Sequence, residues 1–152
     1  MIRWAGPQDA DTLGRVFYAA IHEGPSPYTD AQRAAWVAAP PSGDLWRDRL
    51  AGHHIAMAER DGNAAGFMSI MAGGYIDLAF MRLQYRGQGI FRQLYEHIDR
   101  QARSQGDQVL STHASLMAQP AFRAMGFLVI HHETVERHGE TLARAKMEKR
   151  LG

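Results

Sequence analysis

The chain predicts a mixed α/β (α+β) fold, in which helices cover the faces of one β-sheet. An apolar, strand-like run at Tyr75–Leu83 passes through a glycine-bearing turn into an amphipathic helix. Two further apolar runs, Ile55–Glu59 and Ala64–Met71, flank Asp61-Gly62, a pair typical of a β-hairpin turn. The whole chain gives the order β-α-α-β-β-β-α-β-α-β-β, with about seven strands and about four helices. Only the crossover through the long helix must join parallel strands.

The remaining elements are predicted from apolar periodicity and from residues that begin or end helices. In chain order they are a strand at Met1–Trp4, a helix at Asp9–Ile21, a helix from a Thr29 cap to Val37, a short helical segment capped by Asp44, a strand at Val109–Thr112, a helix at Ala118–Met125 with Ser115 placed to cap it, and strands at Phe127–Val135 and Thr141–Lys149. Glycines at positions 106 and 126 are expected to end the two later helices.

The stretch Gln84–Leu94 predicts an anion site. Ile90, Leu94 and Ile98 begin an apolar stripe that makes the segment after the turn a helix. A glycine turn before a helix aims free backbone N–H groups and the positive end of the helix dipole at one point, most often a phosphate. A P-loop is excluded because no Lys-Ser/Thr follows the glycines, and a dinucleotide fingerprint is excluded because Arg92 stands where a small residue is needed.

Composition narrows the class of protein. The chain has 152 residues, of which 45% are apolar and 22% charged, with a formal net charge of +1 and no cysteine. These values fit an ordinary soluble domain, and they argue against a nucleic-acid or polybasic membrane partner and against a disulfide framework. The first residues lack the apolar region of a signal peptide, so a cytoplasmic location is expected. The 8 histidines show no ligand spacing, so no metal site is expected.

Three local signatures resemble one family. Arg86, Gly89 and Phe91 occupy the three positions of Gln/Arg-x-x-Gly-x-Gly/Ala, the acyl-CoA loop of the GNAT N-acetyltransferase superfamily; the first two match and the third does not. The segment Ser115–Phe127 resembles the later motif of the family, in which Asn or Ser precedes Ala, an aromatic pair and Gly-Phe. Met147–Leu151 resembles the Met-x-Lys-x-Leu ending common in bacterial members. The resemblance covers nearly the whole chain and implies one GNAT-like domain over residues 1–152, with a centrally splayed sheet.

The resemblance implies acetyl-CoA, or a related acyl-CoA, as co-substrate. It places the pyrophosphate on the backbone N–H groups of residues 86–91 and the pantetheine along residues 81–83. The residues implied to bind the cofactor are Met81, Arg82, Leu83, Arg86, Gly87, Gln88, Gly89, Ile90, Phe91, Ser115 and Phe122.

The implied reaction is direct acetyl transfer to a neutral primary amine of a small molecule or peptide. In the family one strand residue leaves its backbone N–H free to hold the thioester carbonyl, and the aligned residue here is Met81. Asp77 is the candidate general base, because period-two alternation predicts Asp77, Ala79 and Met81 on one face of the strand. A hydrogen-bonded structural Asp is the alternative for this position.

Two positions depart from the family pattern. Phe122 stands where the family carries a tyrosine, and it can pack but cannot donate a proton to the leaving thiolate. Ser115, His113 or solvent is expected to take over that role, although Ser115 also fits a helix cap and His113 a strand end. Phe91 replaces a small residue beside the phosphates, and its place in the apolar stripe beside Tyr95 predicts that its ring enters the core.

The acceptor site in this family is built largely by the first two helices and their loop. The implied substrate-binding residues are Tyr28, Trp36, Trp46 and Tyr75, of which the two tryptophans would also serve as core anchors. Homodimers are common in the family, and the strands in Phe127–Lys149 are the expected contact. A non-catalytic acyl-CoA sensor of the same fold is the alternative function, which the two departures from the family pattern keep open.

Overall fold

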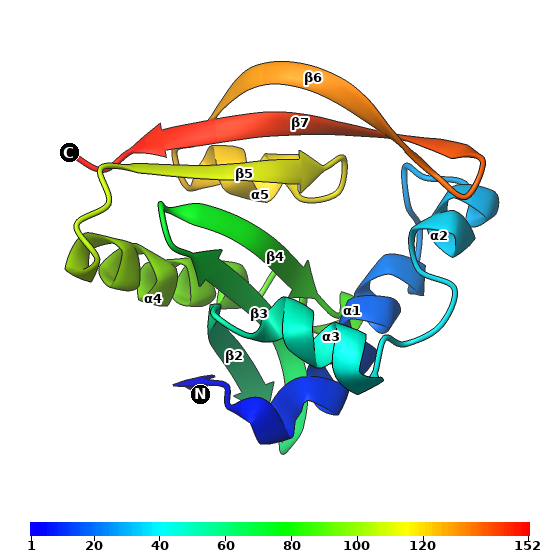
Figure 1. The fold of residues 1–152 in the computed structure, drawn as a ribbon, viewed down its shortest axis with the longest axis horizontal. Helices are drawn as coiled ribbons and strands as arrows, with labels where there is room; N and C mark the ends of the chain where they lie inside the picture. Colours follow the sequence, from blue (N-terminus) through cyan, green and yellow to red (C-terminus); the bar gives the residue numbers. More distant parts are fainter.

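All seven strands lie in one mixed sheet with the order β1-β2-β3-β4-β5-β7-β6 in the computed structural model, which describes residues 1–152 (Figure 1). The strands are β1 Ile2–Trp4, β2 His54–Arg60, β3 Asn63–Met71, β4 Tyr75–Met81, β5 Val109–Ser115, β6 Leu128–Arg137 and β7 Glu140–Arg150. The α-helices are α1 Ala10–His22, α2 Asp30–Trp36, α3 Gly43–Leu50, α4 Ile90–Ser104 and α5 Gln119–Ala124. The pair β4–β5, joined through α4, is parallel and the other neighbours are antiparallel, as predicted.

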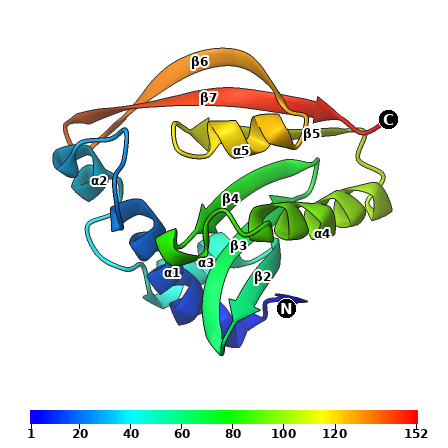
Figure 2. The same ribbon diagram turned by 180° about the vertical axis from the view of Figure 1, so that it is seen from behind.

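The helices cover the two faces of the sheet. The helices α1 and α3 pack on one face, where Phe17, Trp46 and Phe67 belong to one buried cluster. The helix α4 lies across the other face of β2 and β3, and α5 follows β5, as the view from behind shows (Figure 2). Leu94 and Phe122 from these two helices share a second buried cluster. None of the helices combines the length and the apolar character needed to cross a membrane.

Local sequence signals account for several of these elements. Asp61 and Gly62 have φ angles of 55° and 78° and form the two-residue turn between β2 and β3, which confirms the predicted hairpin. Thr29 caps α2 by accepting a hydrogen bond from the N–H of Gln32, while the Gln32 side chain accepts from the N–H of Thr29.

Three predicted boundaries are wrong. Ser42, rather than Asp44, is the N-cap of α3; Asp44 lies in the first turn, and the segment is a full helix that raises the number of helices from about four to five. The strand β4 ends at Met81 instead of Leu83, because Leu83–Tyr85 form a 3-10 turn. The strand β5 continues beyond Thr112 to Ser115, because β7 pairs with it as far as the Ser115–Arg144 pair.

A β-bulge interrupts β4 at Asp77. Ser69 of β3 pairs with Leu78 and the next residue, Ile70, pairs with Ile76, so Asp77 has no partner on β3. The buried Ser69 hydroxyl lies 3.1 Å from the backbone nitrogen of Leu78 and accepts its hydrogen bond. The side chain of Ser69 therefore replaces a backbone acceptor at the bulge.

The strands β4 and β5 separate directly after the bulge begins. Their pairing consists of Tyr75 with Ser111 and Ile76 with Thr112. The hydroxyl of Thr112 donates to the carbonyl of Ile76 over 2.9 Å, at the last paired position. Beyond this point the side of β4 that faces β5 has no strand partner, which agrees with the splayed sheet implied by the resemblance.

The bulge gives a prediction about stability. Ser69→Ala leaves the buried N–H of Leu78 without its acceptor, so we expect the free energy of unfolding to fall by about 1–3 kcal/mol in urea titrations. Ser111→Ala is the matched control, because the half-buried Ser111 hydroxyl on β5 forms no side-chain hydrogen bond. Equal stability of the two variants would show that the Ser69 hydroxyl does not stabilise the bulge.

Candidate active site

The bulge changes which face each β4 side chain occupies, so the predicted common face of Asp77, Ala79 and Met81 is wrong. Leu78 and Phe80 pack with the buried cluster beneath α1 and α3. Ala79 and Met81 pack against the cluster beneath α4. The Asp77 carboxylate meets side chains from α3 and the loop that follows it. One extra residue in a strand shifts the alternation of all residues after it, and this separates Asp77 from Ala79 and Met81.

The backbone N–H of Met81 faces the opening between β4 and β5. The next N–H along the chain, that of Arg82, donates to the carbonyl of Ala65 on β3 over 2.9 Å. Successive N–H groups of a strand point to opposite edges, so the N–H of Met81 points toward the β5 side. The strand β5 has already separated there, which leaves this N–H available to a ligand.

Two adjoining cavities occupy this opening, with volumes of about 340 and 430 Å³. Both are lined by Ala79, Phe80, Ser115 and Ala118. We call the larger one the glycine-loop cavity, because residues 85–87 and 89–92 line it together with α5. We call the smaller one the aromatic cavity, because seven Phe, Tyr and Trp side chains line it: Phe17, Tyr28, Trp36, Trp46, Tyr75, Phe80 and Phe122. The two therefore meet between the diverging ends of β4 and β5.

The glycine-loop cavity ends at the N-terminus of α4. Gly87 and Gly89 have φ angles of 78° and 80°, and an added Cβ at either position would meet no atom within 4 Å. The helix has no side-chain N-cap and no acidic residue in its first turn, where Arg92 adds a positive charge. A basic residue at this end opposes the helix dipole unless an anion is bound. The arrangement thus suits a phosphate.

The Arg86 side chain turns away from this anion site. Its Nε donates to the carbonyl of Met81 over 3.1 Å, and its Nη2 donates to the carbonyl of Ala20 on α1 over 2.9 Å. Burial lowers the pKa of this guanidinium below its ordinary value. Arg86 consequently braces the glycine loop against β4 and α1.

The other residues implied to bind the cofactor divide into two groups. Those that line the glycine-loop cavity are Met81, Arg86, Gly87, Gly89, Ile90, Phe91 and Ser115, and those that do not are Arg82, Leu83, Gln88 and Phe122. Arg82 pairs with Glu23 at 2.7 Å, and Gln88 bonds to the carbonyl of Gln84. The Phe91 ring packs against the core, as predicted, with its centroid 5.3 Å from that of Phe122.

All four residues implied to bind the acceptor line the aromatic cavity. Phe80 lies between Phe17 and Trp36, with centroid distances of 4.6 and 6.0 Å, so the rings form a continuous wall. Trp46 is 4% exposed and donates its indole N–H to the carbonyl of Ala10, which makes it mainly a core anchor. The Tyr28 hydroxyl donates to the carbonyl of Ala143 and anchors the loop before α2 to β7.

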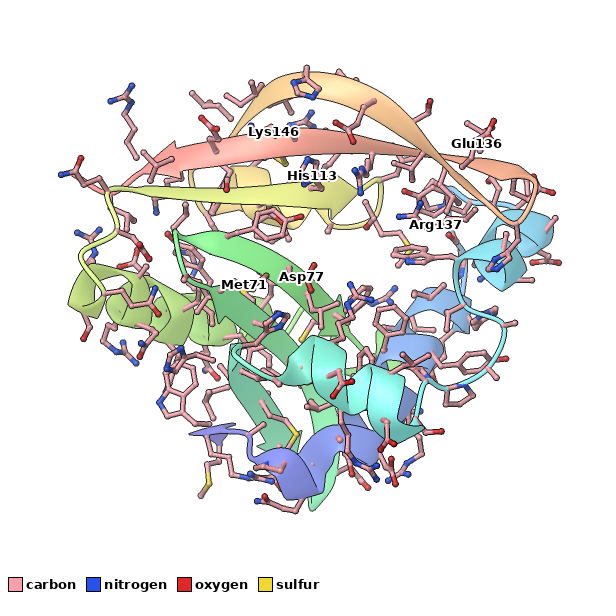
Figure 3. All side chains as sticks on the ribbon, in the orientation of Figure 1. Met71, Asp77, His113, Glu136, Arg137 and Lys146 are labelled. Carbon is pink, nitrogen blue, oxygen red and sulfur yellow. The ribbon has the colours of Figure 1, made fainter.

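A polar edge faces this aromatic wall. The Asp77 carboxylate lies 3.4 Å from Nε of Arg49 and 3.9 Å from Nε2 of His53. Across the opening, Nδ1 of His113 lies 2.8 Å from the hydroxyl of Tyr75. Burial lowers the pKa of both histidines below 6.5, so both are neutral at pH 7. Figure 3 shows Asp77 on β4 and His113 on β5, on either side of this opening.

Four arginines near the cavities were not expected from the sequence. Arg49, Arg137 and Arg144 line the aromatic cavity, and Arg92 lines the glycine-loop cavity. The sequence signal for Arg92 is a basic residue in the first turn of a helix. Residues 137 and 144 lie on β6 and β7, outside the three family signatures, and no local pattern indicates that they line a cavity. No group of three His, Cys, Asp or Glu side chains in the structure could hold a metal ion.

Comparison with known sequences gives one family. A family model described as "Acetyltransferase (GNAT) domain" matches residues 26–151 of the chain. No curated protein matches the sequence.

Solved structures share the fold over nearly the whole chain. A structure from Rhodopseudomonas palustris, described as "GCN5-Related N-acetyltransferase: Aminotransferase, Class-II", has 28% identity and a TM-score of 0.92, covering 99% of this chain and 95% of that one. A PaiA N-acetyltransferase from Thermoplasma acidophilum, in complex with coenzyme A, has 16% identity and a TM-score of 0.72 over 99% and 98% of the two chains. A phosphinothricin acetyltransferase from Sinorhizobium meliloti, in complex with acetyl-CoA, has 18% identity and a TM-score of 0.72 over 100% and 88%.

The buried His53 gives a prediction about pH. Its side chain is 4% exposed and its Nδ1 has no hydrogen-bond partner. Because burial lowers its pKa, the unfolded chain binds a proton near pH 6.5 while the folded chain does not. We expect the free energy of unfolding to fall as the pH drops from about 7.5 to 5.5, and to fall less steeply in His53→Gln. His132→Gln, at an exposed site on β6, is the control for urea titrations at each pH. Equal slopes in both variants would contradict the role of His53.

Proposed function

This chain belongs to the GNAT acetyltransferase family, and we propose that it transfers the acetyl group of acetyl-CoA to the primary amine of a small molecule or peptide. The observation that carries the proposal is the junction of the two cavities. There the free N–H of Met81 lies between a cavity that ends at an anion site and a cavity walled by aromatic rings. Acetyl-CoA supplies the activated thioester.

The glycine-loop cavity fits the cofactor. Its open glycine surface, the uncapped N-terminus of α4 and Arg92 provide donors and positive charge for a pyrophosphate. The apolar side chains of Met81, Phe91 and the α5 residues provide a wall of the kind that a pantetheine arm needs. Arg86 holds the loop in place from behind, so the donors are preorganised.

The Met81 N–H is assigned to the thioester carbonyl, where it would stabilise the negative charge that develops on oxygen. As the new C–N bond forms, the C–S bond breaks and the amine loses one proton. Asp77 is assigned as the base that receives this proton, directly or through water, because it lies on the aromatic-cavity side of β4. Contacts of 3.4 and 3.5 Å from the Arg49 guanidinium orient this carboxylate.

Ser115 is assigned to the leaving thiolate. Ser115 lines both cavities, and its hydroxyl accepts a hydrogen bond from the N–H of Ala118 over 3.2 Å. A hydroxyl that accepts one bond still has its own proton to donate. Phe122 is 1% exposed and contributes packing alone. Since a thiolate is a good leaving group, solvent protonation remains the alternative to Ser115.

The second candidate function is a non-catalytic acyl-CoA sensor of the same fold. Phe122 favours it, because the ring offers no proton to the thiolate. A sensor would bind acetyl-CoA at the same glycine loop and release no CoA with any amine. The homodimer contact predicted at Phe127–Lys149, which now comprises β6 and β7, stays a prediction.

The anion site predicts a specific loss of cofactor binding. Acetyl-CoA should raise the melting temperature of the wild type, because a ligand that binds the native state stabilises it. Gly89→Glu should abolish this shift, since it places a carboxylate at the N-terminus of α4. Gly106→Glu is the matched control, because that glycine has a φ of 83° and equally open surroundings at the other end of the helix. Equal shifts of the melting temperature in both variants would show that acetyl-CoA does not bind at the glycine loop.

If Asp77 is the base, its substitution should lower the rate of acetyl transfer without weakening acetyl-CoA binding. Asp77→Asn should lower kcat/KM for the best amine by about 10²- to 10⁴-fold, as loss of a general base does, while the acetyl-CoA melting shift persists. The measurement is CoA release over an amine panel at several pH values. Asp44→Asn, on the exposed side of α3, controls for the lost charge. If Asp77→Asn kept full activity, Asp77 would be a structural residue and not the base. If the wild type released no CoA with any amine, the result would favour the acyl-CoA sensor.

A further inference from the structure

Arg137 is held at the edge of the aromatic cavity by contacts of its hairpin with α2. It is the last residue of β6, and the following turn brings His138 to the carbonyl of Ala35 at 2.9 Å. On the other side of the turn, the side-chain amide of Gln32 donates to the carbonyl of Thr141 over 2.8 Å. The two contacts tie the tip of the β6–β7 hairpin to α2, so the position of Arg137 relative to the cavity is defined.

The charged groups around the aromatic cavity leave one positive charge uncompensated. Arg49 pairs with Asp77, and Arg144 pairs with Glu133 at 2.6 Å. His113 is neutral at pH 7 because burial lowers its pKa. The side-chain bond of Arg137 goes to the neighbouring carbonyl of Glu136, and no carboxylate lies within ion-pair distance of its guanidinium, including that of its cross-strand neighbour Glu140. Arg137 is therefore the arginine of the aromatic cavity whose guanidinium has no carboxylate partner; Figure 3 shows its position on β6.

Most of the uncharged lining residues of the aromatic cavity are apolar, and the cavity itself is small. The wall formed by Phe17, Phe80 and Trp36 continues into Val135 and Leu142 of the late strands. A volume of about 340 Å³ lies at the lower end of ligand pockets, so it suits a molecule of a few carbons with one ring or a branched chain. A guanidinium beside such a wall binds a carboxylate well, because its planar donors match the two oxygens.

We propose that the acceptor carries a carboxylate and an apolar or aromatic group beside its amine, as a free amino acid does, and that Arg137 binds this carboxylate. The proposal rests on the proposed acetyl transfer and names the class of its acceptor. The amine then faces Asp77 and the junction of the cavities, while the apolar group lies on the Phe80 wall.

Matched acceptor pairs test this assignment. We would measure CoA release with L-phenylalanine against phenethylamine and with L-tyrosine against tyramine, each pair differing by one carboxylate. The wild type should prefer the carboxylate-bearing member of each pair. Arg137→Gln should lower kcat/KM for that member by about 10- to 100-fold and leave the other member unchanged, as expected for loss of a charge-assisted hydrogen bond. The ratio between the variant and the wild type cancels the different reactivities of the two amines.

Arg150→Gln is the control, because this exposed arginine ends β7 and lines neither cavity. The carboxylate subsite would be overturned if Arg137→Gln lowered kcat/KM equally for both members of a pair. It would also be overturned if the wild type preferred the amines that lack the carboxylate. Either result would leave the proposed acetyl transfer intact. Release of CoA with neither member of any pair would overturn the proposed acceptor class. If the wider amine panel were also silent, the proposed acetyl transfer itself would fail.

Discussion

The separation of β4 from β5 is the constraint on which the candidate site depends. The two strands are neighbours in the sheet, yet only Tyr75 and Ile76 of β4 pair with β5. The bulge at Asp77 bends β4 at that point, and the side chain of Ser69 compensates the backbone group that loses its partner. A continuous pair of strands would bury the N–H of Met81 in a ladder of hydrogen bonds. Divergence instead leaves that N–H at the junction of two cavities.

The two cavities differ in what they can bind, and the difference follows from the elements that line them. The N-terminus of α4 gives the glycine-loop cavity a fixed positive potential from backbone dipoles and Arg92. The aromatic cavity takes its rings from α1, α2 with the loop before it, α3, β4 and α5, and its charges from α3, β4, β6 and β7. In the proposed reaction, an activated acyl group held in the glycine-loop cavity would meet an acceptor from the aromatic cavity at the shared residues 79, 80, 115 and 118.

Signals that lie within a few residues of each other predicted most of the fold and the glycine turn before α4. The Asp61-Gly62 turn, the Thr29 cap and the glycines before α4 depend on local backbone conformation, which the sequence specifies. The face of the sheet on which Asp77 lies could not be predicted, because the bulge depends on Ser69 from the neighbouring strand. Arg137 could not be predicted either, because the contacts between α2 and the β6–β7 hairpin bring it to the cavity from more than a hundred residues away.

The Arg86 side chain stabilises the glycine loop instead of pointing toward the proposed anion site. A loop with two glycines in the left-handed region has high conformational freedom, so ordering its N–H groups around an anion costs entropy. The guanidinium of Arg86 removes part of that freedom by bonding to carbonyls on β4 and α1, two elements that do not belong to the loop. Burial of the charge is offset by those bonds. At the proposed anion site the positive charge comes from the helix end and Arg92, so the residue that would fix the loop differs from those that would bind the anion.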